Sequence, residues 1–194
     1  YFHAFAKKQP DLNWENPEVR NALYDIANFW IQKGVGGFRM DAVVYIKKPA
    51  DFADGKPDAS DGMVLIHEMT ANRDGILDYL HEFKKKVLDG KNVFTVGEAN
   101  GIRPEELKHW VGSEGVFDML FEFNHLQGGD IWYNPNLLST LDLKKAIFQS
   151  EKATATNGWY PVFFENHDKP RSVNAYFPDS ADKALASKAL MTLL

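Results

Sequence analysis

Three carboxylate side chains in this chain follow short runs of residues that favour β-strands. The runs are 36–41, which ends at Asp41, 92–98, which ends at Glu98, and 159–164, which is followed by Asp168. In a parallel α/β sheet the strand ends gather on one face, so these acids are expected to converge there. Converging acids can bind a hard cation, perform acid–base chemistry, or be unrelated structural groups.

The neighbours of the three acids differ, which favours acid–base chemistry over a metal site. Arg39 precedes Asp41 by two residues, and His167 directly precedes Asp168. Different surroundings separate the pKa values of an acid and a nucleophile. Alternation along a strand places Arg39 and Asp41 on one side of the chain, with Met40 on the other. Taken alone, however, Arg39 and Asp41 could be a buried structural ion pair.

The elements that must position these acids alternate between strand and helix. Asn16 and Pro17 predict a helix start, and Gly34 predicts its end. Further helices are expected at 74–88, at 104–110, from a cap at Ser139, and from a cap at Asp179 or Ser180, and strands at 36–41, 92–98, 116–123 and 159–164. A helix followed by four strand–loop–helix repeats is typical of a parallel α/β sheet.

Composition excludes several classes of partner. The 194 residues are 44% hydrophobic and 25% charged, with a net charge of −5 and no cysteine. The basic residues form no run beyond 84–86, which argues against nucleic acid and anionic membranes as partners. No apolar run approaches the ~20 residues of a membrane span, and a cytoplasmic location is expected.

Two stretches of the chain are predicted to have irregular structure. Residues 46–72 contain scattered Pro and Gly and predict a long active-site loop, with disorder as the alternative. Residues 1–15 are interpreted as the end of an inserted loop domain. Within the longer stretch, His67 and Glu68 resemble part of a metalloprotease motif, but Ala71 stands where the second His is required. The pair is therefore interpreted as loop, or at most an outer-subsite contact.

Four motifs, in this order, give the chain a family resemblance. They are Gln9-Pro-Asp-Leu-Asn13, Gly37-Phe-Arg-Met-Asp41, Val96-Gly-Glu98 and Glu165-Asn-His-Asp168 with Lys169-Pro-Arg171. Together they resemble the α-amylase superfamily of glycoside hydrolases, family 13, and more closely its oligo-1,6-glucosidase and α-glucosidase subgroup. The resemblance spans nearly the whole chain.

The resemblance implies a retaining mechanism acting on an oligosaccharide substrate. Asp41 matches the nucleophile, Glu98 the general acid/base, and Asp168 the third carboxylate that holds the sugar hydroxyls. Arg39 and His167 match residues that position the nucleophile and the same sugar. Because Arg39 lies near Asp41, Glu98 is expected to have the higher pKa of the two catalytic carboxyls.

Two further residues are expected to contact the substrate. Ala42 flanks the second sugar by the resemblance, where valine goes with α-1,6 preference, so this alanine favours α-1,4 or mixed activity. Arg171 would help to close the rear of the pocket, with an ordinary loop ion pair as the alternative. No metal is expected from these residues, since the calcium site of many relatives is built elsewhere.

The resemblance also predicts the extent of the fold. Residues 1–194 would form part of a single catalytic (β/α)₈ barrel, about strands four to seven with their helices. The chain is thus interpreted as an internal fragment that is inactive alone and self-associates through exposed barrel edges. Two alternatives remain: a transglucosylase or isomerase of the trehalose synthase or sucrose isomerase type, and a non-catalytic binding relative.

Overall fold

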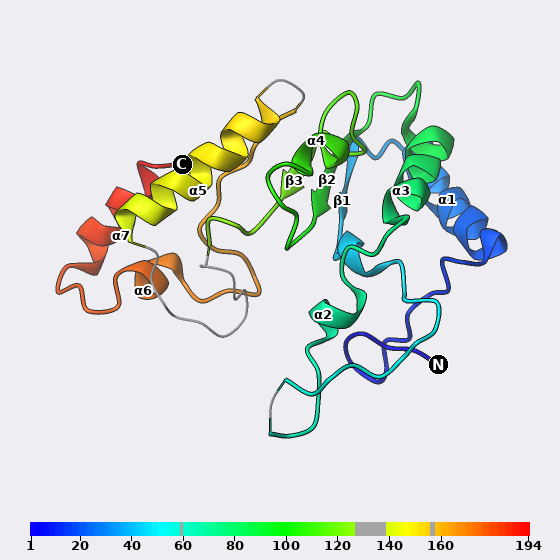
Figure 1. Cartoon of the computed structure of the whole chain (residues 1–194). Coiled ribbons are helices and arrows are strands. Elements are labelled where there is room, and N and C mark those ends of the chain that lie inside the picture. The colour runs from blue at the N-terminus through cyan, green and yellow to red at the C-terminus, as the bar shows by residue number, and fades with distance from the viewer. Residues whose placement is uncertain (59, 127–138, 156–157) are drawn as a thin grey trace.

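The fold is a three-stranded parallel sheet with helices on both sides (Figure 1). The computed structural model describes residues 1–58, 60–126, 139–155 and 158–194. The strands, in spatial order, are β1 (Gly37–Met40), β2 (Phe94–Glu98) and β3 (Met119–Phe121). The helices are α1 (Pro17–Gln32), α2 (Ile66–Thr70), α3 (Ile76–Phe83), α4 (Leu107–Trp110), α5 (Thr140–Thr154), α6 (Ser172–Tyr176) and α7 (Lys183–Met191), with a 3₁₀-helix at Val43–Tyr45 and a π-helix at Lys84–Leu88.

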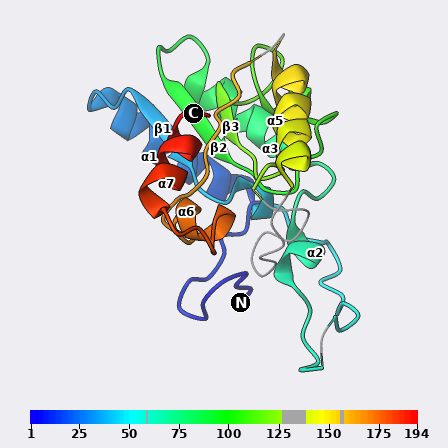
Figure 2. The same ribbon diagram turned by 90° about the vertical axis from the view of Figure 1, so that its left-hand side faces the viewer.

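The helices divide into two groups. Figure 1 shows α1 and α3 on the β1 side of the sheet and α5, α6 and α7 on the β3 side. In the turned view, α6 and α7 stand in front of the sheet (Figure 2). In the part of the chain that the structure describes, no helix combines the length and the apolar character needed to cross a membrane.

Two helix starts confirm the predicted caps. The Asn16 side chain accepts a hydrogen bond from the Glu18 N–H at 2.9 Å, and Pro17 is the first residue of α1. The Ser139 hydroxyl accepts from the Asp142 N–H at 3.2 Å at the start of α5. Each cap satisfies a backbone donor that has no partner within its own helix.

The strand register brings two of the acids together. Met40 pairs with Gly97, so Asp41 and Glu98 occupy the next positions at the same edge of the sheet. Gly97 is required there because a Cβ would lie 2.8 Å from the Phe117 ring. Gly37 is required in β1 because a Cβ would lie 2.6 Å from the Phe94 carbonyl oxygen. Close packing of β2 against β3 therefore fixes where Glu98 emerges.

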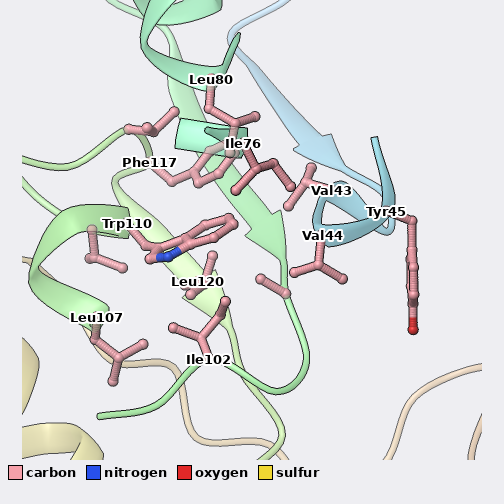
Figure 3. Packing of buried hydrophobic residues seen from close by; sticks show 13 residues of the cluster. Val43, Val44, Tyr45, Ile76, Leu80, Ile102, Leu107, Trp110, Phe117 and Leu120 are labelled. Atoms are coloured by element: carbon pink, nitrogen blue, oxygen red, sulfur yellow. The ribbon is translucent and has the colours of Figure 1, made fainter. Parts of the chain in front are cut away.

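The main core covers one face of this sheet (Figure 3). Val43 lies next to Ile76 of α3, and Val44, Tyr45 and Leu80 belong to the same cluster. The cluster continues through Ile102, Leu107, Trp110, Phe117 and Leu120. A smaller cluster packs α1 against α3 and the π-helix through Tyr24, Phe83, Val87 and Leu88. Both clusters contact Met40, which anchors the strand that ends at Asp41.

The structure corrects the predicted fourth strand. Residues 159–164 form no strand; their pairing with the sheet is a single bridge between Met119 and Trp159 in the described residues. Trp159 is 68% exposed, so the apolar run does not reflect a buried strand here. Strand pairing depends on a neighbour distant in sequence, which the local pattern does not reveal.

Two smaller predictions are also wrong. His67 and Glu68 lie in α2 rather than in loop. The last helix is capped by Asp182, whose side chain accepts from the Leu185 N–H at 2.9 Å, and not by Asp179 or Ser180. The short helix α6 has no counterpart among the predicted elements.

Candidate active site

Arg39 links the two carboxyl groups at the ends of β1 and β2. Its Nη1 donates to Asp41 Oδ1 at 2.5 Å, and its Nη2 lies 2.9 Å from Glu98 Oε2. The side chain of Glu98 is 14% exposed and that of Asp41 is 74% exposed. Arg39 and Asp41 therefore form the predicted ion pair, but the pair is not buried. A second carboxyl group, that of Glu98, shares the arginine.

The two carboxyl groups have pKa values shifted in opposite directions. The hydrogen bond from Arg39 lowers the pKa of Asp41 below its usual value. Burial raises the pKa of Glu98, and the attraction of Arg39 and the Ala42 N–H only partly offsets it. Of the two groups, Asp41 is thus the one that loses its proton at lower pH, and Glu98 is the one that keeps its proton to higher pH. The sequence predicted this order of pKa values.

Ala42 adopts an uncommon backbone conformation that aims a donor at Glu98. It has φ of 45°, in the left-handed region that non-glycine residues seldom adopt. Its N–H donates to Glu98 Oε2 at 3.2 Å. Arg39 and Ala42 therefore both contact Oε2 of Glu98. The buried 3₁₀-helix Val43–Tyr45 follows directly and holds this turn in place.

Asp168 lines a pocket together with Asp41 and Glu98. The pocket has a volume of about 80 Å³. Its lining residues are Phe5, Asp41, Ala42, Tyr45, Glu98, Asn100, Phe123, Asn166, Asp168 and Lys169. The Asp168 N–H donates to Asn166 Oδ1 at 3.0 Å, which shapes the turn that carries it. All three predicted catalytic acids therefore meet in one place.

His167 lies beside this pocket rather than in its lining. Its Nε2 is 3.4 Å from Asp168 Oδ2, and its side chain is 68% exposed. Its charge contributes to lowering the pKa of Asp41, after the larger effect of Arg39. It lines a neighbouring cavity with Glu165 and Arg171. His167 is therefore close to two of the acids.

Arg171 forms a loop ion pair. It lies 2.7 Å from Glu165 Oε1, and the Ser172 N–H donates to Glu165 Oε2 at 2.5 Å at the start of α6. The Ser172 N–H, followed by Arg171, lowers the pKa of Glu165 to about 2. Arg171 does not line the pocket of the three acids, and its role in substrate binding stays a prediction.

Sequence reasoning missed several lining residues. Tyr45 and Asn100 border the pocket, and Asn100 Nδ2 donates to the Tyr45 hydroxyl at 3.3 Å. The Tyr45 hydroxyl also lies 3.1 Å from His67 Nδ1, so α2 supports this side of the pocket. Both lining residues follow a strand-end acid by two to four positions, which is the signal that could have identified them.

A larger cavity lies elsewhere and contains none of the three acids. It has a volume of about 940 Å³ and is bordered by Tyr1, Phe2, residues 11–15, residues 46–50, Phe52 and residues 71–74. Its cations Lys47 and Lys48 pair with Glu15 at 3.0 Å and Asp11 at 3.1 Å. We place the site at the smaller pocket because the carboxyl groups with shifted pKa values are there.

The fold and the site together define a class of protein. It is an α/β protein whose polar site lies at the carboxyl ends of parallel strands and contains two carboxyl groups with pKa values shifted in opposite directions. Residues 1–194 match the family model described as alpha amylase, catalytic domain. The chain belongs to the alpha-amylase family.

Within this family, the chain is similar to bacterial oligo-1,6-glucosidases. The chain is 40% identical over 191 residues to the probable oligo-1,6-glucosidase 3 of Bacillus subtilis (strain 168), covering 98% of this chain and 34% of that protein. It is 36% identical over 200 residues to the oligo-1,6-glucosidase of Parageobacillus thermoglucosidasius, covering 100% and 35%. The chain thus spans about a third of the length of these relatives.

Solved structures show the same likeness. An inactive double mutant of MutB, the trehalulose synthase of Pseudomonas mesoacidophila MX-45, matches with a TM-score of 0.85 and 31% identity. The match covers 100% of this chain and 35% of that chain.

Proposed function

We propose that this chain carries the catalytic carboxyl groups of a retaining α-glucosidase, which releases terminal glucose from short oligosaccharides. The observation that carries the proposal is Arg39 bound to both Asp41 and Glu98, whose pKa values are shifted in opposite directions. The oligo-1,6-glucosidase relatives support the substrate class.

We infer retention of configuration because Arg39 contacts both carboxyl groups and so keeps Asp41 and Glu98 near each other. Inverting enzymes hold their two carboxyl groups ~6.5–9.5 Å apart to admit a water. Asp41 attacks the anomeric carbon, and Glu98 protonates the leaving oxygen as the glycosidic bond breaks. Glu98 then takes a proton from water, which attacks the same carbon and releases Asp41.

Asp168 has a separate role in this proposal. It faces Asp41 and Glu98 across the pocket, where it would accept hydrogen bonds from sugar hydroxyls next to the reacting carbon. Those bonds strengthen as the ring distorts toward the transition state. His167, beside Asp168, would contact the same sugar. The barrel in which these strands lie would be a (β/α)₈ barrel, with β1 to β3 as its fourth to sixth strands.

Ala42 bears on the linkage that is cleaved. We assign α-1,4 or mixed preference, and an Ala42→Val variant tests it by crowding the second sugar. We expect kcat/KM for isomaltose relative to maltose to rise roughly 10-fold, since a few methyl groups discriminate by about that much. At φ of 45° a β-branched residue is disfavoured, so a lower Tm is expected as well. An unchanged substrate ratio contradicts the assignment.

A second candidate function is transfer of the glucosyl group to a sugar instead of water. The likeness to MutB, a trehalulose synthase, favours it, and the same three acids would form the same intermediate. Product analysis of the intact gene product separates the two functions. Glucose release from maltose and isomaltose supports hydrolysis, whereas a rearranged disaccharide from maltose or sucrose supports transfer.

A further inference from the structure

The segment that leads to Asp168 has almost no backbone attachment to the sheet. In the described residues, its pairing is the single bridge between Met119 and Trp159, and no strand forms from 160 to 164. Asp168 nevertheless reaches the pocket that contains Asp41 and Glu98. Side chains must therefore hold the segment in place.

A buried polar network makes that attachment. His125, which follows β3 by four residues, is completely buried, and its Nε2 lies 2.5 Å from the Phe163 carbonyl oxygen. A carbonyl oxygen only accepts hydrogen bonds, so Nε2 carries a proton. His125 Nδ1 lies 2.8 Å from the Tyr160 hydroxyl and 3.5 Å from Glu122 Oε1. The histidine thus contacts the segment at both ring nitrogens.

Glu122 is a charged group in an apolar place. It is 1% exposed, and its Oε2 accepts from the Asn124 N–H at 2.8 Å. Burial raises the pKa of Glu122, but hydrogen bonds from His125, Tyr160 and Asn124 outweigh burial and bring the pKa below its usual value. Apolar residues of similar volume often stabilise a fold at least as much as a buried charged network does. A role in orientation explains its presence better than a role in stability.

Aromatic packing connects the segment 160–164 to the residues at the end of β3. The Phe163 ring packs edge-on against Phe121, at 5.3 Å between centroids, and against Phe123 at 5.4 Å. Phe121 pairs with Glu98 in the sheet, and Phe123 borders the pocket with Asp168. The attachment therefore lies between the strand ends and the turn that carries the third acid.

We propose that Glu122, His125 and Tyr160 are positioning residues that hold the segment 160–168 against the end of β3, so that Asp168 faces Asp41 and Glu98. The catalytic part of this inference rests on the proposed function. The network acts through Asp168 and touches no substrate.

Tyr160→Phe tests the inference in the intact gene product, because it removes one hydroxyl and little volume. Tyr176→Phe is the matched control, since the Tyr176 hydroxyl is buried and has no hydrogen-bond partner among the described residues. For a nitrophenyl α-glucoside we expect Tyr160→Phe to lower kcat/KM about 10-fold, because small misplacements cost up to ~10² in rate. Tyr176→Phe is expected to change it less than about 2-fold. Equal effects overturn the inference.

A double-mutant cycle separates positioning from a general structural role. In an Asp168→Asn background, Tyr160→Phe is expected to have less than about a 2-fold further effect, because the group it positions is already altered. The same 10-fold loss in both backgrounds overturns the inference, since the network would then act independently of Asp168.

Proteolysis tests the attachment without any activity. Trypsin can cleave after Arg171, whose side chain is 81% exposed. Loosening the segment with Tyr160→Phe is expected to speed this cleavage several-fold relative to Tyr176→Phe, as measured by mass spectrometry. Equal cleavage rates contradict the positioning role. If the wild-type protein hydrolyses no glucoside, the proposed function fails, but this measurement still decides the inference.

Discussion

Arg39 is the residue on which the chemistry of the site depends most directly. Its guanidinium offers donors in a fixed planar fork, and here two nitrogens serve two different carboxyls. The hydrogen bond to Asp41 is the largest cause of that residue's lowered pKa, whereas burial dominates at Glu98. One side chain therefore lowers the pKa of Asp41, while burial in the fold raises the pKa of Glu98.

Replacing Arg39 tests this division. In Arg39→Gln the pKa of Asp41 is expected to rise, because its main lowering contact is lost. Asp41 must be ionised to attack, so the acidic limb of the kcat/KM profile should move to higher pH. Arg103→Gln is the control, since among the residues that the structure describes Arg103 pairs only with the nearby surface acids Glu105 and Glu106. An acidic limb at the same pH in Arg39→Gln and wild type would refute the assignment.

At the scale of elements, the register of β1, β2 and β3 places the reacting groups. Gly97 permits the close packing on which that register depends. In Gly97→Ala the new methyl group would lie 2.8 Å from the Phe117 ring and 2.9 Å from Leu120. Overpacking of this kind costs about 1–3 kcal/mol.

The expected result for Gly97→Ala is a lower Tm of the intact gene product together with weaker hydrolysis, because Glu98 follows directly. Gly36→Ala is the matched control: no atom lies within 4 Å of its added Cβ. Thermal unfolding by circular dichroism measures both variants. Equal Tm values would show that the packing of β2 against β3 tolerates a methyl group.

The elements differ in how far sequence alone predicts them. The starts of α1 and α5 were predictable because Asn16 and Ser139 bind backbone donors within their own turn. The ends of β1 and β2 were predictable because the apolar runs there ended in Asp41 and Glu98. The segment 159–164 was not, because its attachment depends on His125 and Phe123, which are distant in sequence.

The residues of the site also differ in how far sequence alone predicts them. Asp41, Glu98 and Asp168 belong to motifs and meet in the pocket as predicted. Tyr45 and Asn100 belong to no quoted motif, and only the folded chain shows that they face the pocket. The burial of Glu122, which is 1% exposed, could not be predicted from its sequence neighbours.

At the scale of the whole molecule, apolar side chains remain exposed on the outer helices. Ile26, Phe29 and Trp30 of α1 are 50–56% exposed, and Leu185 and Met191 of α7 are 64% and 66% exposed. The rings of Phe29 and Trp30 also contact each other, and exposed apolar patches are typical of interaction sites. We therefore expect the 194-residue polypeptide, expressed alone, to self-associate.

Sedimentation measures this association. The average mass of the polypeptide is expected to rise with concentration, and a Phe29→Gln, Trp30→Gln variant, which keeps good helix-forming residues, should associate more weakly. A single monomeric species of the wild-type sequence at all concentrations would refute the expectation.

The polypeptide expressed alone is also expected to be inactive. The pocket that contains the three acids has a volume of about 80 Å³, well below the ~300–1,000 Å³ of most ligand sites.

The most direct test of the account is to find the covalent intermediate. In the intact gene product, Glu98→Gln removes the acid/base that releases the glucosyl group, while α-glucosyl fluoride needs no acid to react. Mass spectrometry of the digested protein is expected to show one glucosyl residue on Asp41, and none after Asp41→Asn is added. A glucosyl group on another residue, or turnover with inverted configuration and no adduct, would contradict the assignment of Asp41 as the nucleophile.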